Sequence, residues 1–90
     1  MVTKAEKAYM DAVARLPCAI CGTLGVHLHH AREGQGGSQR AQNWLVIPLC
    51  PRCHTGPHGI HGDKAMWKIR KMDEMDALAE TIAAVWIVNR

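Results

Sequence analysis

Both ends of the chain carry apolar residues at helical spacing. Near the N-terminus these residues are Ala5, Ala8, Tyr9, Ala12, Val13 and Leu16, which predicts a helix over residues 3–16. Thr3, followed three positions later by Glu6, is typical of a capping box at a helix start. Pro17 is expected to end the helix, because a proline disfavours helical geometry in the residue before it.

Residues 63–89 predict further helices. Asp63 can cap a helix over residues 64–71, and Asp73 begins a second one with acidic residues in its first turn. The apolar stripe of the second helix, interpreted as core packing, comprises Met75, Leu78, Ala79, Ile82, Val85 and Trp86. Residues 85–88 are apolar nearly all round, so this end is expected to be buried or to meet another subunit.

Short apolar runs with strand character lie between the helical regions. Residues 26–31, in which apolar positions and histidines alternate, predict one strand, and residues 44–47, bounded by Pro48, predict another. The glycine-rich segment 33–39 lacks the GK[ST] ending of a Walker motif, so a turn is expected there. Glycines and a proline make residues 55–62 a poor regular helix.

The length of 90 residues leaves room for one small domain. With 48% hydrophobic and 21% charged residues, the chain is neither disordered nor fibrous. The longest apolar run, residues 82–88, is far too short to cross a membrane, and the N-terminus does not resemble a signal peptide. A cytoplasmic location without a membrane partner is therefore expected.

Four cysteines form two C-x2-C pairs: Cys18, Cys21, Cys50 and Cys53. In a cytosolic chain this usage favours metal over disulfides, and two such turns can present four thiolates to one tetrahedral zinc ion. A redox dithiol is the alternative for either pair, disfavoured because both pairs lie beside turn residues. A closed four-thiolate site is structural and contributes on the order of 10 kcal/mol to folding, which would offset the thin core of a chain without phenylalanine.

Charge and histidines concentrate in the middle of the chain. The net charge is +3, but residues 27–72 carry seven lysines and arginines against two acidic residues, which favours an anionic partner there. The same segment contains His29, His30, His54, His58 and His61, too many for core packing to explain, so a second metal site is expected. His27 is expected to face elsewhere and to be structural.

With Asn43, these residues match a known pattern. His29-His30, Asn43 and Cys50-x-x-Cys53-His54 resemble the HNH (ββα-metal) endonuclease motif in its four-cysteine form. More narrowly, the run from residue 28 to 54, with G-I-H-G after it, resembles the nuclease domain of the phage Ref family, the RecA-dependent recombination-enhancement nucleases.

The resemblance covers about residues 14–67. It implies an α+β fold with a small zinc-stapled ββα-metal core and flanking N- and C-terminal helices. The single nuclease domain would span residues 1–90, with a helix over 3–16, the zinc and ββα-metal core over 17–62 and C-terminal helices over 63–89.

The resemblance also assigns roles. His30 would be the general base that takes a proton from the attacking water, and Asn43 would hold its imidazole in place by hydrogen bonding to the backbone. The catalytic divalent metal would be held by His29, His54 and one of His58 or His61, a choice that the spacing leaves open. Arg32 and Arg40, on either side of the glycine-rich segment, could clamp DNA phosphates.

Imidazole ligands suit Mn²⁺, Co²⁺, Ni²⁺ or Zn²⁺ better than Mg²⁺, although substrate oxygens could recruit Mg²⁺. Such ligands are expected to lose the metal below about pH 6, where free imidazole protonates. The expected function is a metal-dependent DNA endonuclease of low sequence specificity in phage or bacterial DNA recombination or processing. DNA is the expected partner, a RecA-like filament is a candidate second one, and the oligomeric state stays open.

Two other functions compete with this expectation. The first is a non-catalytic, zinc-stabilised nucleic-acid-binding module, supported by the cysteines and the basic central segment and independent of His30. The second is a protein-interaction module, supported only by the apolar C-terminal helix.

Overall fold

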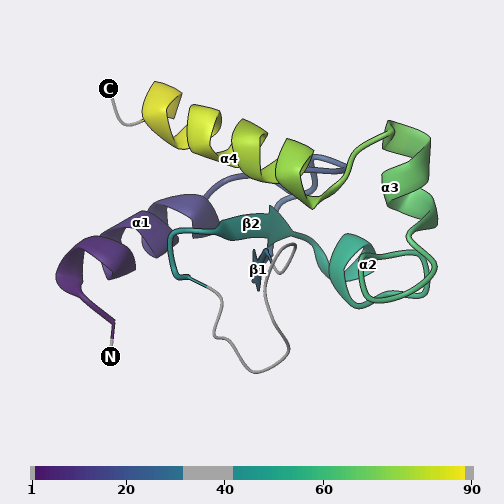
Figure 1. Ribbon diagram of the computed structural model, residues 1–90, viewed down its shortest axis with the longest axis horizontal. Helices are drawn as coiled ribbons and strands as arrows, with labels where there is room; N and C mark the ends of the chain where they lie inside the picture. Colours follow the sequence, from purple (N-terminus) through teal and green to yellow (C-terminus); the bar gives the residue numbers. More distant parts are fainter. Residues whose placement is uncertain (1, 32–41, 89–90) are drawn as a thin grey trace.

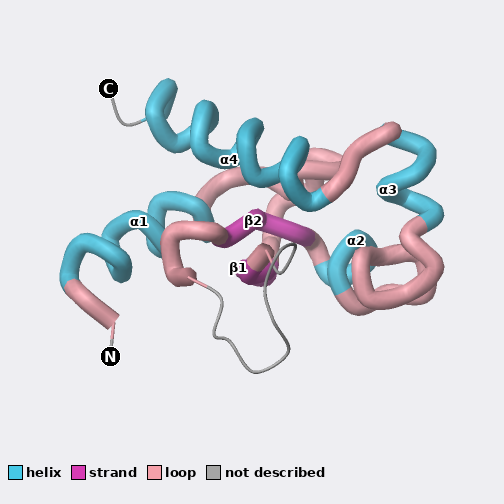
Figure 2. Tube along the Cα trace, in the orientation of Figure 1, coloured by secondary structure: helices cyan, strands magenta, loops and turns pink. Residues whose placement is uncertain are grey.

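The computed structural model describes residues 2–31 and 42–88, which form a small mixed structure of helices around a two-stranded antiparallel sheet. In chain order the elements are α1 (Lys4–Ala14), β1 (His27–His30), β2 (Val46–Leu49), α2 (Pro51–His54), α3 (Ala65–Arg70) and α4 (Glu74–Val88). Figure 1 shows α1 at one end of the sheet, α2 and α3 toward the other, and α4 running alongside β2. Figure 2 shows that loops and turns make up much of the chain between β2 and α4.

Helix α1 begins as the sequence predicts. The Thr3 hydroxyl accepts a hydrogen bond from the Glu6 backbone amide at 3.1 Å, and the Glu6 carboxylate accepts one from the Thr3 amide at 3.1 Å. The helix ends at Ala14, two residues earlier than predicted, because the chain tightens into a turn in which the Leu16 amide donates to the Val13 carbonyl at 3.0 Å. That turn buries the Leu16 side chain.

The first strand is one residue shorter at each end than its predicted range, and the second is shifted by two residues. β1 begins at His27, and β2 covers Val46–Leu49, so Trp44 lies in the preceding turn and Pro48 lies inside the strand. Proline cannot donate to a ladder, yet Pro48 is tolerated because the sheet has only two strands. Its carbonyl accepts from the Ala19 amide at 2.9 Å, which ties the first cysteine turn to β2.

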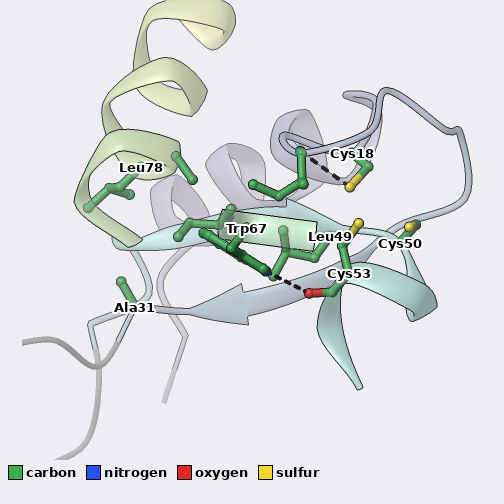
Figure 3. Packing of buried hydrophobic residues seen from close by; sticks show 10 residues of the cluster. Cys18, Ala31, Leu49, Cys50, Cys53, Trp67 and Leu78 are labelled. Atoms are coloured by element: carbon green, nitrogen blue, oxygen red, sulfur yellow. Dashed lines mark hydrogen bonds between the residues drawn. The ribbon is translucent and has the colours of Figure 1, made fainter. Parts of the chain in front are cut away.

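The core lies where β2, the cysteine turns, α3 and α4 meet (Figure 3). Trp67, only 2% exposed, is its largest fully buried side chain among the described residues, and its indole N–H donates to the Cys53 carbonyl at 3.0 Å. α3 starts at Ala65, not at residue 64, because Lys64 adopts a left-handed conformation with φ 63°. Asp63 still accepts a hydrogen bond from the Ala65 amide at 2.9 Å.

The face of α4 that packs against the core differs from the predicted apolar stripe. The buried face carries Ala77, Leu78 and Thr81, whereas Met75 is 52% and Trp86 71% exposed. Thr81 can lie on the buried face because its hydroxyl donates to the Ala77 carbonyl at 2.8 Å. In a helix that is apolar nearly all round, several faces satisfy the spacing, so contacts with the sheet select the one that is buried.

The C-terminal end of α4 is likewise not buried within the described residues, since Trp86 and Ile87 are both largely exposed. No helix in residues 2–31 and 42–88 has the length and hydropathy needed to span a membrane.

Candidate metal centres

The four cysteines converge from two turns that are 28 residues apart in sequence. Cys18 and Cys21 lie on the turn after α1, whereas Cys50 and Cys53 lie at the end of β2 and in α2. Their sulfur atoms all lie within 4.8 Å of one another. The Cys21 and Cys50 sulfurs are 3.5 Å apart, far longer than a disulfide of about 2.05 Å, and all four thiols are free.

This arrangement fits a zinc ion. Zinc–thiolate bonds of about 2.3 Å in a tetrahedron place neighbouring sulfurs about 3.8 Å apart, close to the separation found here. The Ile20 amide approaches the Cys18 sulfur at 3.4 Å, a contact that stabilises a thiolate. The cysteine cluster is therefore positioned to hold a metal ion, consistent with structural zinc.

The thiols of Cys53 and Cys21 have pKa values shifted in opposite directions. Burial raises the pKa of Cys53, so its thiolate is unfavourable without a nearby cation. Partial burial opposes ionisation of Cys21, but hydrogen bonds with Thr23 outweigh it and lower the pKa of Cys21 to about 6. A bound cation would compensate the cost of ionising the buried thiols, which is a second reason to place one here.

Three histidines form a second group of candidate ligands. His29 comes from β1, His54 from the end of α2 and His61 from the turn that follows, and their ring nitrogens all lie within 4.8 Å of one another. The Nε2 atoms of His54 and His61 are 3.2 Å apart. We refer to these three residues as the histidine cluster.

The turn after α2 brings His61 to this cluster. The His61 amide donates to the His54 carbonyl at 3.1 Å, and the preceding Ile60 amide donates to the Cys53 carbonyl at 2.9 Å. A glycine is needed at position 59, because a Cβ there would lie 2.7 Å from the His54 carbonyl oxygen. The irregular structure expected for residues 55–62 is what allows this return of the chain.

His58, the other candidate for the third ligand, does not belong to the histidine cluster. Its Nδ1 lies 3.2 Å from each carboxylate oxygen of Asp63, and its side chain is exposed. Helical spacing between His54 and His58 does not apply, because α2 ends at His54.

The expectation that His27 faces elsewhere is wrong. Residues two apart in a strand point to the same face, so His27 shares the face of His29. Its Nδ1 lies 3.2 Å from His54 Nδ1, beside the histidine cluster.

Burial favours the neutral form of two members of the histidine cluster, His54 and His29. Burial, with the neighbouring His29, His61 and His27, lowers the pKa of His54 to about 4. Burial also lowers the pKa of His29, although the nearby Glu74 carboxylate opposes that shift. Neutral imidazole is the form that binds a metal ion, so the surroundings of His29 and His54 favour their use as ligands at neutral pH.

His30 points away from the cluster, toward Asn43. Its Nε2 lies 3.1 Å from the Asn43 side-chain oxygen, and the Asn43 amide nitrogen donates to a Glu6 carboxylate oxygen at 2.9 Å. Asn43 thus contacts the His30 imidazole directly with its side chain.

The contacts of two carboxylates were not predicted from the sequence: Glu6 contacts Asn43, and Glu74 contacts His29. Glu6 was interpreted only as part of a capping box, and Glu74 only as a favourable acidic residue at a helix start. A Glu74 oxygen lies 2.5 Å from His29 Nε2, and His29 itself is 4% exposed. No sequence pattern links these glutamates to the histidines. Glu6 lies 24 positions from His30, and Glu74 lies 45 positions from His29.

A cavity of about 520 Å³ opens beside His29 and His61. Its walls include Ile60 and Trp67, and the lysines of α3 and its start, Lys64 and Lys68, line it as well. Asp73 and Glu74 also line the cavity, which leaves one side of the histidine cluster accessible. Arg32 and Arg40, the expected phosphate clamps, lie outside the described residues.

Among models of known protein families, DUF968, described as a protein of unknown function, matches residues 1–86. No curated protein and no solved structure is significantly similar to the chain.

Proposed function

The chain belongs to the DUF968 family, and we propose that this member is a metal-dependent DNA endonuclease of the HNH type. The observation that carries the proposal is the pair of adjacent histidines on β1. His29 joins a cluster of three imidazoles that could hold a divalent metal, and His30 contacts Asn43. A metal site and a histidine base side by side are the components that hydrolysis of a phosphodiester requires.

In this proposal His30 is the general base. Its Nε2 is engaged by Asn43, which leaves Nδ1 to accept a proton from the attacking water. Asn43 keeps the ring from rotating, so the free nitrogen stays aimed in one direction. His30 is half-buried, which leaves one side of its ring open to substrate.

The histidine cluster would hold the catalytic metal through His29, His54 and His61. When bound, that ion supplies positive charge opposite the scissile phosphate and the leaving 3′ oxygen. An all-imidazole set suits Mn²⁺, Co²⁺, Ni²⁺ or Zn²⁺, and substrate oxygens could still recruit Mg²⁺. The four cysteines would hold a separate structural zinc.

Substrate would enter over the cavity beside His29 and His61, where Lys64 and Lys68 can attract phosphate. The proposed partner is DNA in the cytoplasm, cut with low sequence specificity during phage or bacterial recombination or processing. The resemblance to the Ref nucleases adds a RecA-like filament as a second proposed partner.

The experiment that tests this function uses purified protein with its zinc retained. Supercoiled and single-stranded DNA are incubated with the protein and each of Mn²⁺, Co²⁺, Ni²⁺, Zn²⁺ and Mg²⁺, and nicked or shortened products are measured. Cleavage with at least one metal, absent in the His30→Ala variant, is the expected result.

The competing function, a non-catalytic nucleic-acid-binding module, rests on the four cysteines and the basic central segment. DNA binding that weakens steeply with salt, without cleavage under any of these metals, would favour that module and reject the nuclease.

A further inference from the structure

His29 and His30 are each linked to a carboxylate from a different flanking helix. His29 contacts Glu74 directly, and His30 contacts Asn43, whose amide donates to Glu6. We propose that Glu6 of α1 and Glu74 of α4 fix the tautomers of His30 and His29, so that each imidazole carries its proton on Nε2 and presents Nδ1 to the site. The roles of the two histidines rest on the proposed function, but their tautomers are a property of the protein without substrate.

For His30 the argument runs through the amide of Asn43. A carboxylate can only accept hydrogen bonds, so the Asn43 group that lies 2.9 Å from Glu6 must be its NH₂. The Asn43 oxygen then faces His30 Nε2 at 3.1 Å. An oxygen acceptor requires a donor opposite it, so Nε2 carries the hydrogen and Nδ1 keeps its lone pair.

Glu6 is itself held in place at both oxygens. Oε1 accepts the Thr3 amide at 3.1 Å in the capping box, while Oε2 accepts the Asn43 amide. The start of α1 therefore does more than stabilise a helix, because it anchors the carboxylate that orients Asn43. Glu6 is a positioning residue, and it acts on His30 only through Asn43.

For His29 the contact is direct. His29 Nε2 lies 2.5 Å from a Glu74 oxygen, and the His29 side chain is buried. Glu74 does not enter the group of ligand atoms that lie within 4.8 Å of one another, so its carboxylate stands outside the histidine cluster. With Nε2 donating to Glu74, Nδ1 is the nitrogen left for a metal, and this carboxylate–histidine pairing raises ligand basicity.

The first test reads the tautomers directly. Ring ¹⁵N and ¹H shifts of the histidines are recorded by NMR in protein that retains its cysteine-bound zinc and carries no added divalent metal. Both His29 and His30 are expected to show hydrogen on Nε2. Hydrogen on Nδ1 of either ring overturns the proposal for that residue.

Glu6→Gln is the sharp variant for His30. Glutamine is accepted in a capping box, so α1 should persist, but its one oxygen cannot hold both Thr3 and Asn43. A mixed tautomer at His30, with His29 unchanged, is expected. Asp11→Asn is the matched control, because Asp11 lies on the same helix and forms an exposed ion pair with Lys7. An unchanged His30 tautomer in Glu6→Gln overturns this part.

Glu74→Gln tests the other part through metal affinity. Loss of such an outer carboxylate is expected to weaken Co²⁺ binding at the histidine cluster by about 10- to 100-fold, with zinc content unchanged. Glu80→Gln, elsewhere on α4, is the matched control and should leave affinity unchanged. Unaltered Co²⁺ affinity in Glu74→Gln, or a changed Co²⁺ coordination number that makes Glu74 a ligand, overturns the tautomer role.

These readouts separate the inference from the proposed function. Absence of DNA cleavage, with tautomers and affinities as expected, rejects only the nuclease. Cleavage by wild-type protein, with the His30 tautomer unchanged in Glu6→Gln and the Co²⁺ affinity unchanged in Glu74→Gln, rejects only the role of the two glutamates.

Discussion

At the residue scale, Cys50 belongs both to the apolar core and to the cysteine cluster. Wild-type protein is expected to carry one tightly bound zinc per chain, measured by elemental analysis after purification without chelator. Cys50→Ser should lose that zinc and unfold or aggregate, because a three-thiolate site is weaker and the core is small. Ala79→Ser, at an exposed position of α4, is the control and should keep zinc and fold. Wild-type protein without zinc would contradict this prediction.

His30→Ala should separate catalysis from stability. The side chain is only half-buried and contacts Asn43 rather than the apolar core, so the thermal midpoint should change little. The rate of DNA cleavage should fall on the order of 100-fold or more, the usual effect of removing a general base. Cleavage at a near-normal rate by this variant would remove His30 from the mechanism.

His61→Ala and His58→Ala should differ sharply. His61 lies 3.2 Å from His54 in the histidine cluster, whereas His58 contacts Asp63 at an exposed position. We therefore expect His61→Ala to weaken Co²⁺ binding and cleavage severely, and His58→Ala to retain both. Titration of each variant with Co²⁺ measures the difference, and a severe loss in His58→Ala alone would reverse the assignment.

At the element scale, α3 is a short helix bounded by two left-handed lysines, Lys64 with φ 63° and Lys71 with φ 54°. Lys71→Gly should stabilise the protein by about 0.5–1 kcal/mol, because glycine adopts this C-terminal conformation without the Cβ penalty. Thermal unfolding measures the change. Lys68→Gly, inside α3, is the matched control and should destabilise by about 1 kcal/mol. Equal destabilisation by both variants would contradict the argument.

At the scale of the whole molecule, α2 joins the two candidate metal centres. Cys53 and His54 are consecutive, so the turn that presents a sulfur to one centre also presents an imidazole to the other. Trp67 locks this turn by donating to the Cys53 carbonyl. Removal of a zinc ion held by the cysteine cluster is therefore expected to disturb the histidine cluster as well.

Stability should also depend on pH through the same cluster. His54 has a pKa of about 4 in the fold against an ordinary 6.5, so between these values the unfolded state binds more protons than the native state. Stability of protein without added divalent metal should therefore decrease as pH falls from about 6.5 toward 4, and this contribution should be flat above 6.5.

Thermal unfolding across this window measures the effect, with His54→Gln as the comparison. The variant should show a shallower loss of stability between pH 6.5 and 5 than the wild type. An identical slope in both proteins would mean that His54 does not titrate as its surroundings indicate. The low pKa of His54 also means that protons do not compete with a metal for this one imidazole between about pH 6 and pH 4.

Features that depend on local spacing could be predicted from the amino-acid sequence. The capping box of Thr3 and Glu6, the two C-x2-C turns and the irregular chain after Cys53 all follow from neighbouring residues. Local chemistry suffices for these, because a capping hydrogen bond spans three residues and a cysteine pair needs only one turn.

Only the tertiary structure decided which residues meet across the fold. The chain's return at residue 59 selects His61 over His58, strand geometry turns His27 toward His54, and contacts with the sheet set the rotation of α4. Glu74 contacts His29, and Glu6 contacts the Asn43 amide that meets His30, from helices at opposite ends of the chain. Such contacts depend on how the elements pack in space, and the spacing of residues along the chain carries no information about that packing.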